Sequence, residues 1–286
     1  MSDVLEELVD LLSLERIEEN LLRGQSQDLG WGNVFGGQVL GQALSAAEQT
    51  VSGGRTVHSF HSYFLRTGDA RRPIVYDVDC VRHGKSFTTR RVVAIQGGKP
   101  IFSMSESFQV SEPGFDHQAD KPAAVGPEGL LSEAELARAA KDRIPEAFWE
   151  RALAERPIEI RPVEPIDPLK PTPRPPSRQV WYRAAGRLPD APRIHQYLLA
   201  YASDFNFLGT SMQPHGVSWL TPGMHVARLD HAMWFHRPFR FDDWPLYVVD
   251  SPSASSARGL VRGQFFTEAG VLVASTVQEG LIRRWS

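Results

Sequence analysis

The chain has 286 residues, of which 42% are hydrophobic and 23% charged, ordinary proportions for a globular protein. Its 31 basic and 34 acidic side chains leave a formal charge of −3, which excludes an overall basic surface for nucleic acid and gives no attraction to anionic membranes. The single cysteine, Cys80, excludes an intrachain disulfide and a cysteine-rich zinc site.

The N-terminal part of the chain predicts two helices. Apolar residues recur at helical spacing over residues 3–14, which indicates a short amphipathic helix. Its acidic start is the opposite of a secretory signal, and the chain has no long apolar run, so we expect a cytoplasmic protein without membrane insertion. Residues 36–51 are rich in Ala and Gly and nearly free of charge, which is typical of a helix enclosed by other structure.

Four β-rich runs follow the second helix and predict an antiparallel sheet. They cover residues 58–65, 74–82, 86–96 and 100–110. The pair Gly97-Gly98 between the last two runs indicates a hairpin turn.

The middle of the chain has a different composition. Ser132 and Glu135 fit the capping box of a charged helix. Residues 157–176 contain eight of the 21 prolines, and since proline cannot donate to a β-ladder, much of this stretch is expected to be loop, linker or edge strand. We place the domain boundary in this region.

The last third of the chain repeats the order of the first. An apolar helix over 194–208 precedes β-rich runs at 233–237, 246–250, 258–267 and 271–281. Phe64 and Phe235 are 171 positions apart, as are Arg91 and Arg262, and one ungapped register relates residues 59–109 to 230–280. The repeat predicts two copies of a helix that lies in the curve of an antiparallel sheet.

Two polar residues in apolar surroundings are candidates for chemistry. Asp204 is the only charged side chain in the second apolar helix, and partial desolvation would make it a better base. The alternative is a helix-end aspartate bonded to backbone amides. Gln278 lies on the apolar last strand, where alternation places it on one face with Thr276; ordinary strand polarity is the alternative here.

Five longer segments stand out as motifs: 35–44 (FGGQVLGQAL), 57–66 (VHSFHSYFLR), 195–204 (HQYLLAYASD), 229–238 (LDHAMWFHRP) and 253–259 (SASSARG). Together they resemble acyl-CoA thioesterase II, the bacterial TesB type, and the likeness runs from about residue 3 to 283. The resemblance implies an α+β double hotdog, which is two tandem helix-wrapped antiparallel sheets in one chain. We expect an N-terminal hotdog over 1–115, a helical and proline-rich connector over 116–176 whose end can hold the first strand of the second hotdog, and a C-terminal hotdog over 177–286.

The resemblance also implies an activity. Members of this family hydrolyse acyl-CoA, commonly with medium to long acyl chains, use no metal or redox cofactor, and form homodimers or homotetramers. An Asp, a Gln and a hydroxyl residue hold the attacking water, and the first two match Asp204 and Gln278. The hydroxyl position holds Arg228, which is a departure because arginine neither offers a hydroxyl nor accepts a proton.

Three explanations of this departure are open. Thr276 could supply the missing hydroxyl, or Arg228 could pair with Asp204 and weaken it as a base while water is still positioned. Otherwise the activity is low or shifted toward a charged acyl group. We expect retained thioesterase activity with a modified site.

Four further residues are candidates for substrate binding. The backbone N–H groups of Gly36 and Gly37, at a helix start, are candidates for stabilising the oxyanion. Arg258 and Arg262 could meet the phosphates of CoA, and solvated strand arginines are the alternative.

Two other functions remain as alternatives. One is a hotdog enoyl-CoA hydratase, because Asp190 and His195 have the Asp-x4-His spacing of those enzymes. The other is an acyl-CoA-binding protein with an impaired site, which the presence of Arg228 suggests.

Overall fold

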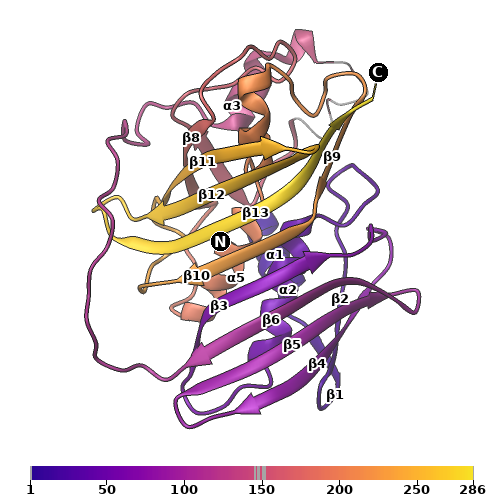
Figure 1. Cartoon of the computed structure of the whole chain (residues 1–286), viewed down its shortest axis with the longest axis vertical. Coiled ribbons are helices and arrows are strands. Elements are labelled where there is room, and N and C mark those ends of the chain that lie inside the picture. Colours follow the sequence, from indigo (N-terminus) through magenta and orange to yellow (C-terminus); the bar gives the residue numbers. More distant parts are fainter. Residues whose placement is uncertain (1, 145, 147–148, 150–152, 286) are drawn as a thin grey trace.

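The computed structural model describes residues 2–144, 146, 149 and 153–285. Within them, the strands form one continuous antiparallel sheet (Figure 1). The N-terminal half contributes, in spatial order, β1 (Glu15–Glu18), β2 (Leu21–Gly24), β4 (Ile74–His83), β5 (Phe87–Gln96), β6 (Lys99–Gln109) and β3 (Thr56–Phe64). The C-terminal half continues with β10 (Asp230–Phe235), β13 (Leu272–Arg284), β12 (Arg258–Phe266), β11 (Leu246–Ser255), β8 (Ser177–Ala184) and β7 (Ile158–Pro162), and β9 (Met224–Arg228) pairs with the end of β13.

The predicted helices are present, with ends that differ by a few residues. They are α1 (Asp3–Leu12), α2 (Gly36–Glu48), α3 (Glu133–Ala139) with its predicted capping box, and α5 (Pro192–Ser203); η1 (Lys141–Arg143) and η3 (Leu208–His215) are short 3-10 helices. The second apolar helix ends at Ser203 rather than at residue 208. Asn206 takes a positive φ of 58°, a left-handed conformation that an α-helix cannot continue through.

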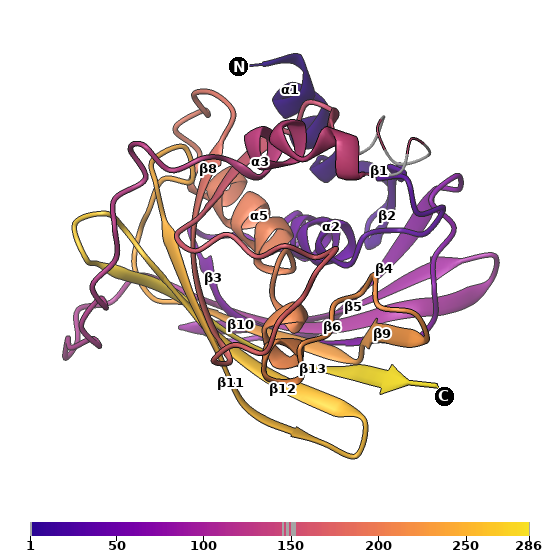
Figure 2. The same cartoon turned by 90° about the horizontal axis from the view of Figure 1, so that it is seen from above.

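Helices α2 and α5 lie against each other in the concave side of the curved sheet (Figure 2). Every residue of α2 from Gly36 to Ala47 is buried, as its uncharged composition predicted. The crossing is close because α2 presents glycine to α5: a Cβ on Gly37 would lie 2.1 Å from the carbonyl oxygen of Tyr201.

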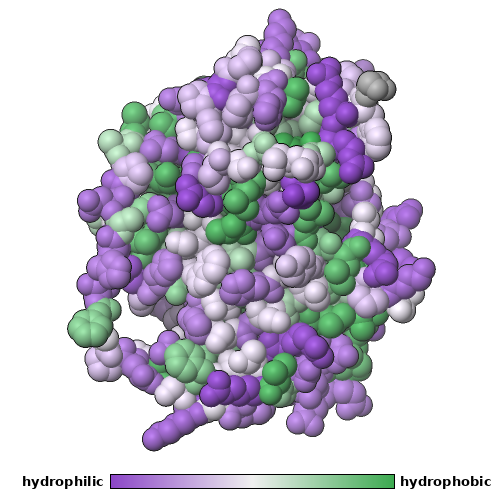
Figure 3. All heavy atoms as spheres, viewed as in Figure 1, coloured by the Kyte–Doolittle hydropathy of each residue, from purple (hydrophilic) through white to green (hydrophobic). Residues whose placement is uncertain are grey.

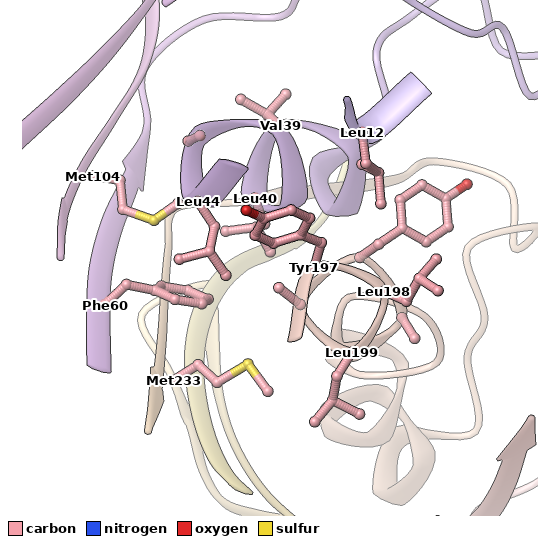
Figure 4. Packing of buried hydrophobic residues seen from close by; sticks show 14 of the residues in the cluster. Leu12, Val39, Leu40, Leu44, Phe60, Met104, Tyr197, Leu198, Leu199 and Met233 are labelled. Atoms are coloured by element: carbon pink, nitrogen blue, oxygen red, sulfur yellow. The ribbon is translucent and has the colours of Figure 1, made fainter. Parts of the chain in front are cut away.

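The core fills the space between these helices and the sheet (Figure 4). Phe60 and Met233 point inward from β3 and β10, toward Leu44 on α2 and Leu199 on α5. All four side chains are fully buried. Apolar side chains on alternate strand positions thus meet apolar helix faces, which gives the expected α+β class.

The two halves join through β3 and β10, so the sheet of the first half continues into the sheet of the second. His61 pairs with Ala232 at the centre of this junction, and these residues are related by the 171-residue offset. The single ungapped register is wrong for the last strand. Met104 pairs with Val92 and Thr276 pairs with Gly263, so the offset is 171 residues in β12 but 172 in β13. The turn over 268–270 is longer than Gly97-Gly98 and accounts for the extra residue.

The outer face of the sheet carries hydrophobic residues scattered among hydrophilic ones (Figure 3). Tyr63 is one of its exposed apolar side chains. No helix within the described ranges is long and apolar enough to cross a membrane.

Candidate active site

Asp204 lies where the two halves of the protein meet. It directly follows the last turn of α5 and is 3% exposed. The first turn of α2 faces it, because a Cβ on Gly36 would lie only 2.6 Å from Oδ2 of Asp204. Glycine at position 36 therefore leaves room for this carboxylate beside the start of a helix, where backbone N–H groups and the helix dipole favour negative charge.

Gln278 reaches Asp204 from β13. Its Nε2 atom donates to Oδ1 of Asp204 at 3.1 Å, and the Gln278 side chain is fully buried. A carboxylate can only accept, so the amide nitrogen must face Asp204 and the amide oxygen must point elsewhere. The sequence singled out these two residues separately, and the fold brings them into direct contact.

His231 on β10 completes this group and was not predicted from the sequence. Its Nδ1 lies 3.0 Å from Nε2 of Gln278, and its Nε2 lies 3.0 Å from Oγ of Ser203. Burial lowers the pKa of His231 to about 4 and keeps the ring neutral near pH 7. A polar residue at an inward position of a buried strand was the available signal.

Arg228, the residue at the family hydroxyl position, pairs with Asp204. Its Nε donates to Oδ1 at 2.5 Å, and its guanidinium lies 5.4 Å from the centre of the Phe35 ring. The Arg228 side chain is 37% exposed, whereas that of Asp204 is fully buried. Arg228 thus forms the border between the buried carboxylate and solvent, and of the second explanation the structure shows the pairing with Asp204.

Thr276 lies on the same inward face as Gln278, as alternation predicted, but its hydroxyl has other partners. It is 2.7 Å from the hydroxyl of Tyr247, which donates to the carbonyl oxygen of Ser203. Because the single Tyr247 proton is used in that bond, the Thr276 proton goes to Tyr247. The structure does not place the Thr276 hydroxyl in a hydrogen bond with Asp204 or Gln278.

The two arginines considered for CoA differ in their surroundings. Arg262 pairs with Asp250 at 2.6 Å on the outer face, and Arg91 pairs with Asp79 in the same way at the equivalent place in the first half. Arg258 pairs with Glu279 at 2.8 Å and also lines a cavity of about 320 Å³. The rest of the lining is six apolar residues, two basic ones and one serine: Met212, Val217, Met224, Ala254, Ala257 and Ile282, with His215, Arg284 and Ser255.

Asp190 and His195, the pair behind the hydratase alternative, make separate contacts. Asp190 forms an exposed ion pair with Arg240. Both ring nitrogens of His195 bond to backbone: Nδ1 accepts from the amide of Phe241, and Nε2 contacts the carbonyl oxygen of Pro189. This arrangement gives His195 a structural role and does not favour a hydratase.

Two oxygens of the site remain without a hydrogen-bond partner within the part of the chain that the structure describes. They are Oδ2 of Asp204 and Oε1 of Gln278, and both are buried. Buried acceptors are normally satisfied, by protein or by ordered water. Two free acceptors on adjacent side chains can receive both hydrogens of one water molecule. The described residues contain no group of three or more His, Cys, Asp or Glu side chains that could hold a metal ion.

Comparisons with known proteins point to one family. Residues 149–281 match the family model described as acyl-CoA thioesterase, and residues 26–109 match that of an acyl-CoA thioesterase N-terminal domain. The chain is 44% identical over 283 residues to the protein named acyl-CoA thioesterase 2 from Haemophilus influenzae, covering 99% of each.

Solved structures agree with this match. An acyl-CoA thioesterase II, TesB2, from Mycobacterium marinum has a TM-score of 0.78 and 40% identity, with 98% of this chain and 99% of that one covered. A protein from Alicyclobacillus acidocaldarius described as having a hot dog fold has a TM-score of 0.77 at 15% identity, again with 98% and 99% covered. The expected double hotdog fold is thereby confirmed.

Proposed function

Because this chain belongs to the acyl-CoA thioesterase family, we propose that it hydrolyses acyl-CoA with a water molecule held between Asp204 and Gln278. As a member of this family, the protein is a thioester hydrolase that acts on acyl-CoA. Two oxygens that have no hydrogen-bond partner in the described part of the chain, Asp204 Oδ2 and Gln278 Oε1, carry the mechanistic part of the proposal.

The reaction is a single displacement. Water donates one hydrogen to each free oxygen, which leaves a lone pair for the thioester carbonyl carbon. Asp204 accepts a proton as the carbon–oxygen bond forms. The carbon–sulfur bond then breaks, and the proton passes to the leaving thiolate, which gives a carboxylic acid and CoA. No covalent enzyme intermediate is needed.

Arg228 and Gln278 select which carboxylate oxygen acts as the base. Both donate to Oδ1 of Asp204, so that Oδ2 keeps its lone pairs for water. Arg228 therefore takes over the orienting part of the family hydroxyl, although it cannot accept a proton. Its position at the solvent border also places a positive charge near the developing oxyanion.

The start of α2 supports the same transition state. Gly36 lies against Asp204 Oδ2, and the N–H groups of Gly36 and Gly37 belong to the first helical turn, which has no carbonyl within the helix to bond. We propose that they stabilise the oxyanion formed from the thioester carbonyl.

The substrate we propose is medium- to long-chain acyl-CoA. Phe35, next to Gly36, stacks on Phe205 and contacts the Tyr201 ring edge-on, so aromatic surface adjoins Asp204. Such surface suits an apolar chain better than a short polar one. For the CoA part of the substrate, Arg258 is the better candidate for a phosphate contact because it lines a partly apolar cavity. Arg262 instead forms an ion pair with Asp250 that has an equivalent, Arg91 with Asp79, in the first half of the protein.

Three expectations about the whole protein belong to the same proposal. We propose the domain limits 1–115, 116–176 and 177–286, a homodimer or homotetramer, and a cytoplasmic location.

The test is CoA release from acyl-CoAs of increasing chain length, followed with a thiol reagent. Asp204→Asn should lower kcat by roughly 10²- to 10⁴-fold, because general base catalysis is lost. Asp190→Asn is the matched control and should act like the wild type. An unmodified protein that binds acyl-CoA without releasing thiol, or that consumes enoyl-CoA instead, would refute the proposal, as would an unchanged rate in Asp204→Asn.

A further inference from the structure

His231 is fully buried and contacts Gln278 on the side of the amide away from the proposed water. Its Nδ1 faces Gln278 at 3.0 Å and its Nε2 faces Ser203 Oγ at 3.0 Å. The hydroxyl of Ser203 donates to the carbonyl oxygen of Ala200 at 2.8 Å. The bonds form a chain that begins at a backbone carbonyl of α5 and ends at the carboxylate of Asp204.

The donors and acceptors of this chain have one consistent assignment. Ser203 uses its proton on Ala200, so it must accept from His231, which places a hydrogen on Nε2 of the ring. A neutral ring then has a bare Nδ1 that accepts from Gln278. The two hydrogens of the Gln278 amide go to His231 and Asp204, and its oxygen is left free.

We propose that His231 is a positioning residue that fixes the side-chain amide of Gln278 with its oxygen toward the attacking water. The inference rests on the function proposed above. Asp204 alone requires the nitrogen to face it but does not hold the second hydrogen of the amide. With a bare Nδ1 behind it, a flipped amide would present its oxygen to two acceptors, which is unfavourable.

The first half of the protein shows that packing does not require a histidine here. Phe60 is the equivalent of His231 in β3, and Glu106 is the equivalent of Gln278 in β6, as the strand registers define them. Phe60 and Glu106 are both buried, and neither Glu106 carboxyl oxygen has a hydrogen-bond partner within the described residues. A phenyl ring thus fills the same place in the repeat, and the copy that carries histidine is the copy with the complete hydrogen-bond chain.

Two substitutions separate the two ring nitrogens. His231→Asn keeps an acceptor where Nδ1 lies and should stay within about tenfold of the wild-type kcat. His231→Gln keeps a polar group near Ser203 but loses the acceptor for Gln278, and should lower kcat by about 100-fold while KM changes little. An equal loss in both variants, or none in His231→Gln, would overturn the inference.

His195 provides the structural control. It is another buried histidine whose two ring nitrogens are bonded, but both bonds go to backbone groups. His195→Asn and His195→Gln should lower the melting temperature and leave kcat unchanged in the folded protein. If the His231 variants also changed only the melting temperature, His231 would be structural.

Nitrogen NMR of the imidazole tests the assignment without using activity. The wild type should show His231 as the neutral tautomer with hydrogen on Nε2, and Gln278→Leu should shift the Nδ1 resonance because its hydrogen bond is lost. A hydrogen on Nδ1 in the wild type would overturn the inference even if CoA is released. Conversely, a wild type that shows the expected tautomer but no CoA release would refute the proposed function alone.

Discussion

The Nε atom of Arg228 lies 2.5 Å from Oδ1 of Asp204, and this ion pair leaves the second carboxylate oxygen free. The pair joins β9 to the end of α5 at the start of α2, so one contact ties together three elements around the reaction centre. Because Asp204 is fully buried and Arg228 is partly exposed, loss of the arginine would leave a buried carboxylate with fewer donors.

The first prediction concerns the donor at position 228. Arg228→Thr and Arg228→Val differ by one hydroxyl in side chains of the same shape, and only threonine can donate to Asp204. We expect the threonine variant to keep at least about tenfold more kcat than the valine variant, since a hydrogen bond to a charged group is involved. Equal rates of CoA release from the two would show that no donor is needed there.

The second prediction concerns the glycines at the start of α2. A Cβ at position 36 would lie 2.6 Å from Asp204 Oδ2, so Gly36→Ala should lower kcat by about 100-fold. Its melting temperature should fall less than that of Gly37→Ala. A Cβ at position 37 would meet the Tyr201 carbonyl oxygen, so Gly37→Ala should mainly lower the melting temperature.

Gly209→Ala is the control for both, because a Cβ there would have no neighbour within 4 Å among the residues that the structure describes. Steady-state kinetics and thermal melts of the three variants would check the contrast. A Gly36→Ala protein with normal kcat would contradict the placement of the site.

The third prediction uses the titration of His231. Its pKa is about 4 in the folded protein, lowered by burial, with Asp204 and Arg228 as the charged groups that face it. An unfolded histidine titrates near 6.5, so between pH 6.5 and 4 the unfolded state holds the extra proton, and stability falls with falling pH. The loss in the free energy of unfolding reaches about 3 kcal/mol below pH 4.

Urea unfolding of the wild type and of His231→Asn at several pH values would isolate this contribution. The stability difference between them should shrink as the pH falls from 6.5 to 4. A difference that stays constant over this range would mean that His231 does not titrate as expected.

The fourth prediction concerns Glu106, the buried counterpart of Gln278. Burial raises the pKa of Glu106 well above its usual range, and the charge of Arg90 offsets only part of this. The Glu106 carboxyl therefore holds its proton more tightly in the folded than in the unfolded protein. As the pH rises above about 4.5, Glu106 lowers the free energy of unfolding by an increasing amount. Glu106→Gln should stabilise the protein at pH 8 but hardly at pH 4, with kcat unchanged, as unfolding curves and assays would show.

The fifth prediction separates the two arginines on β12. Arg258→Gln should raise KM for acyl-CoA on the order of 10-fold, because a charged contact to phosphate is lost, but not KM for the matching acyl-pantetheine, which has no nucleotide. Arg262→Gln, which removes only the outer ion pair with Asp250, should leave both values unchanged. The opposite pattern would reassign the CoA contact to Arg262.

Much of the fold could be predicted because it depends on local pattern. Alternating apolar residues gave the long strands, and the uncharged composition of residues 36–51 gave the enclosed helix. Strands β1 and β9 were missed because they are short and largely exposed, so their residues do not alternate. Strand β8 was not predicted. Strand β7 lies in the proline-rich stretch 157–176, where an edge strand was one of the expectations, and it is the last strand of the sheet.

The candidate site was predicted in part. Asp204 and Gln278 stand out because each is a polar residue in an apolar segment. His231 does not stand out, since its partners Ser203 and Gln278 lie 28 and 47 positions away and no local spacing relates them.

The sequence by itself determined the repeat, the α+β class and the two polar side chains that need partners, because periodicity and composition act over short stretches of chain. Only the tertiary structure decided how these parts combine. Pairing of β3 with β10 merges the halves into one sheet, and the extra residue before β13 sets Gln278, rather than a neighbour, opposite Asp204. Contacts of this kind depend on strand register and helix crossing, which are fixed by packing between distant segments.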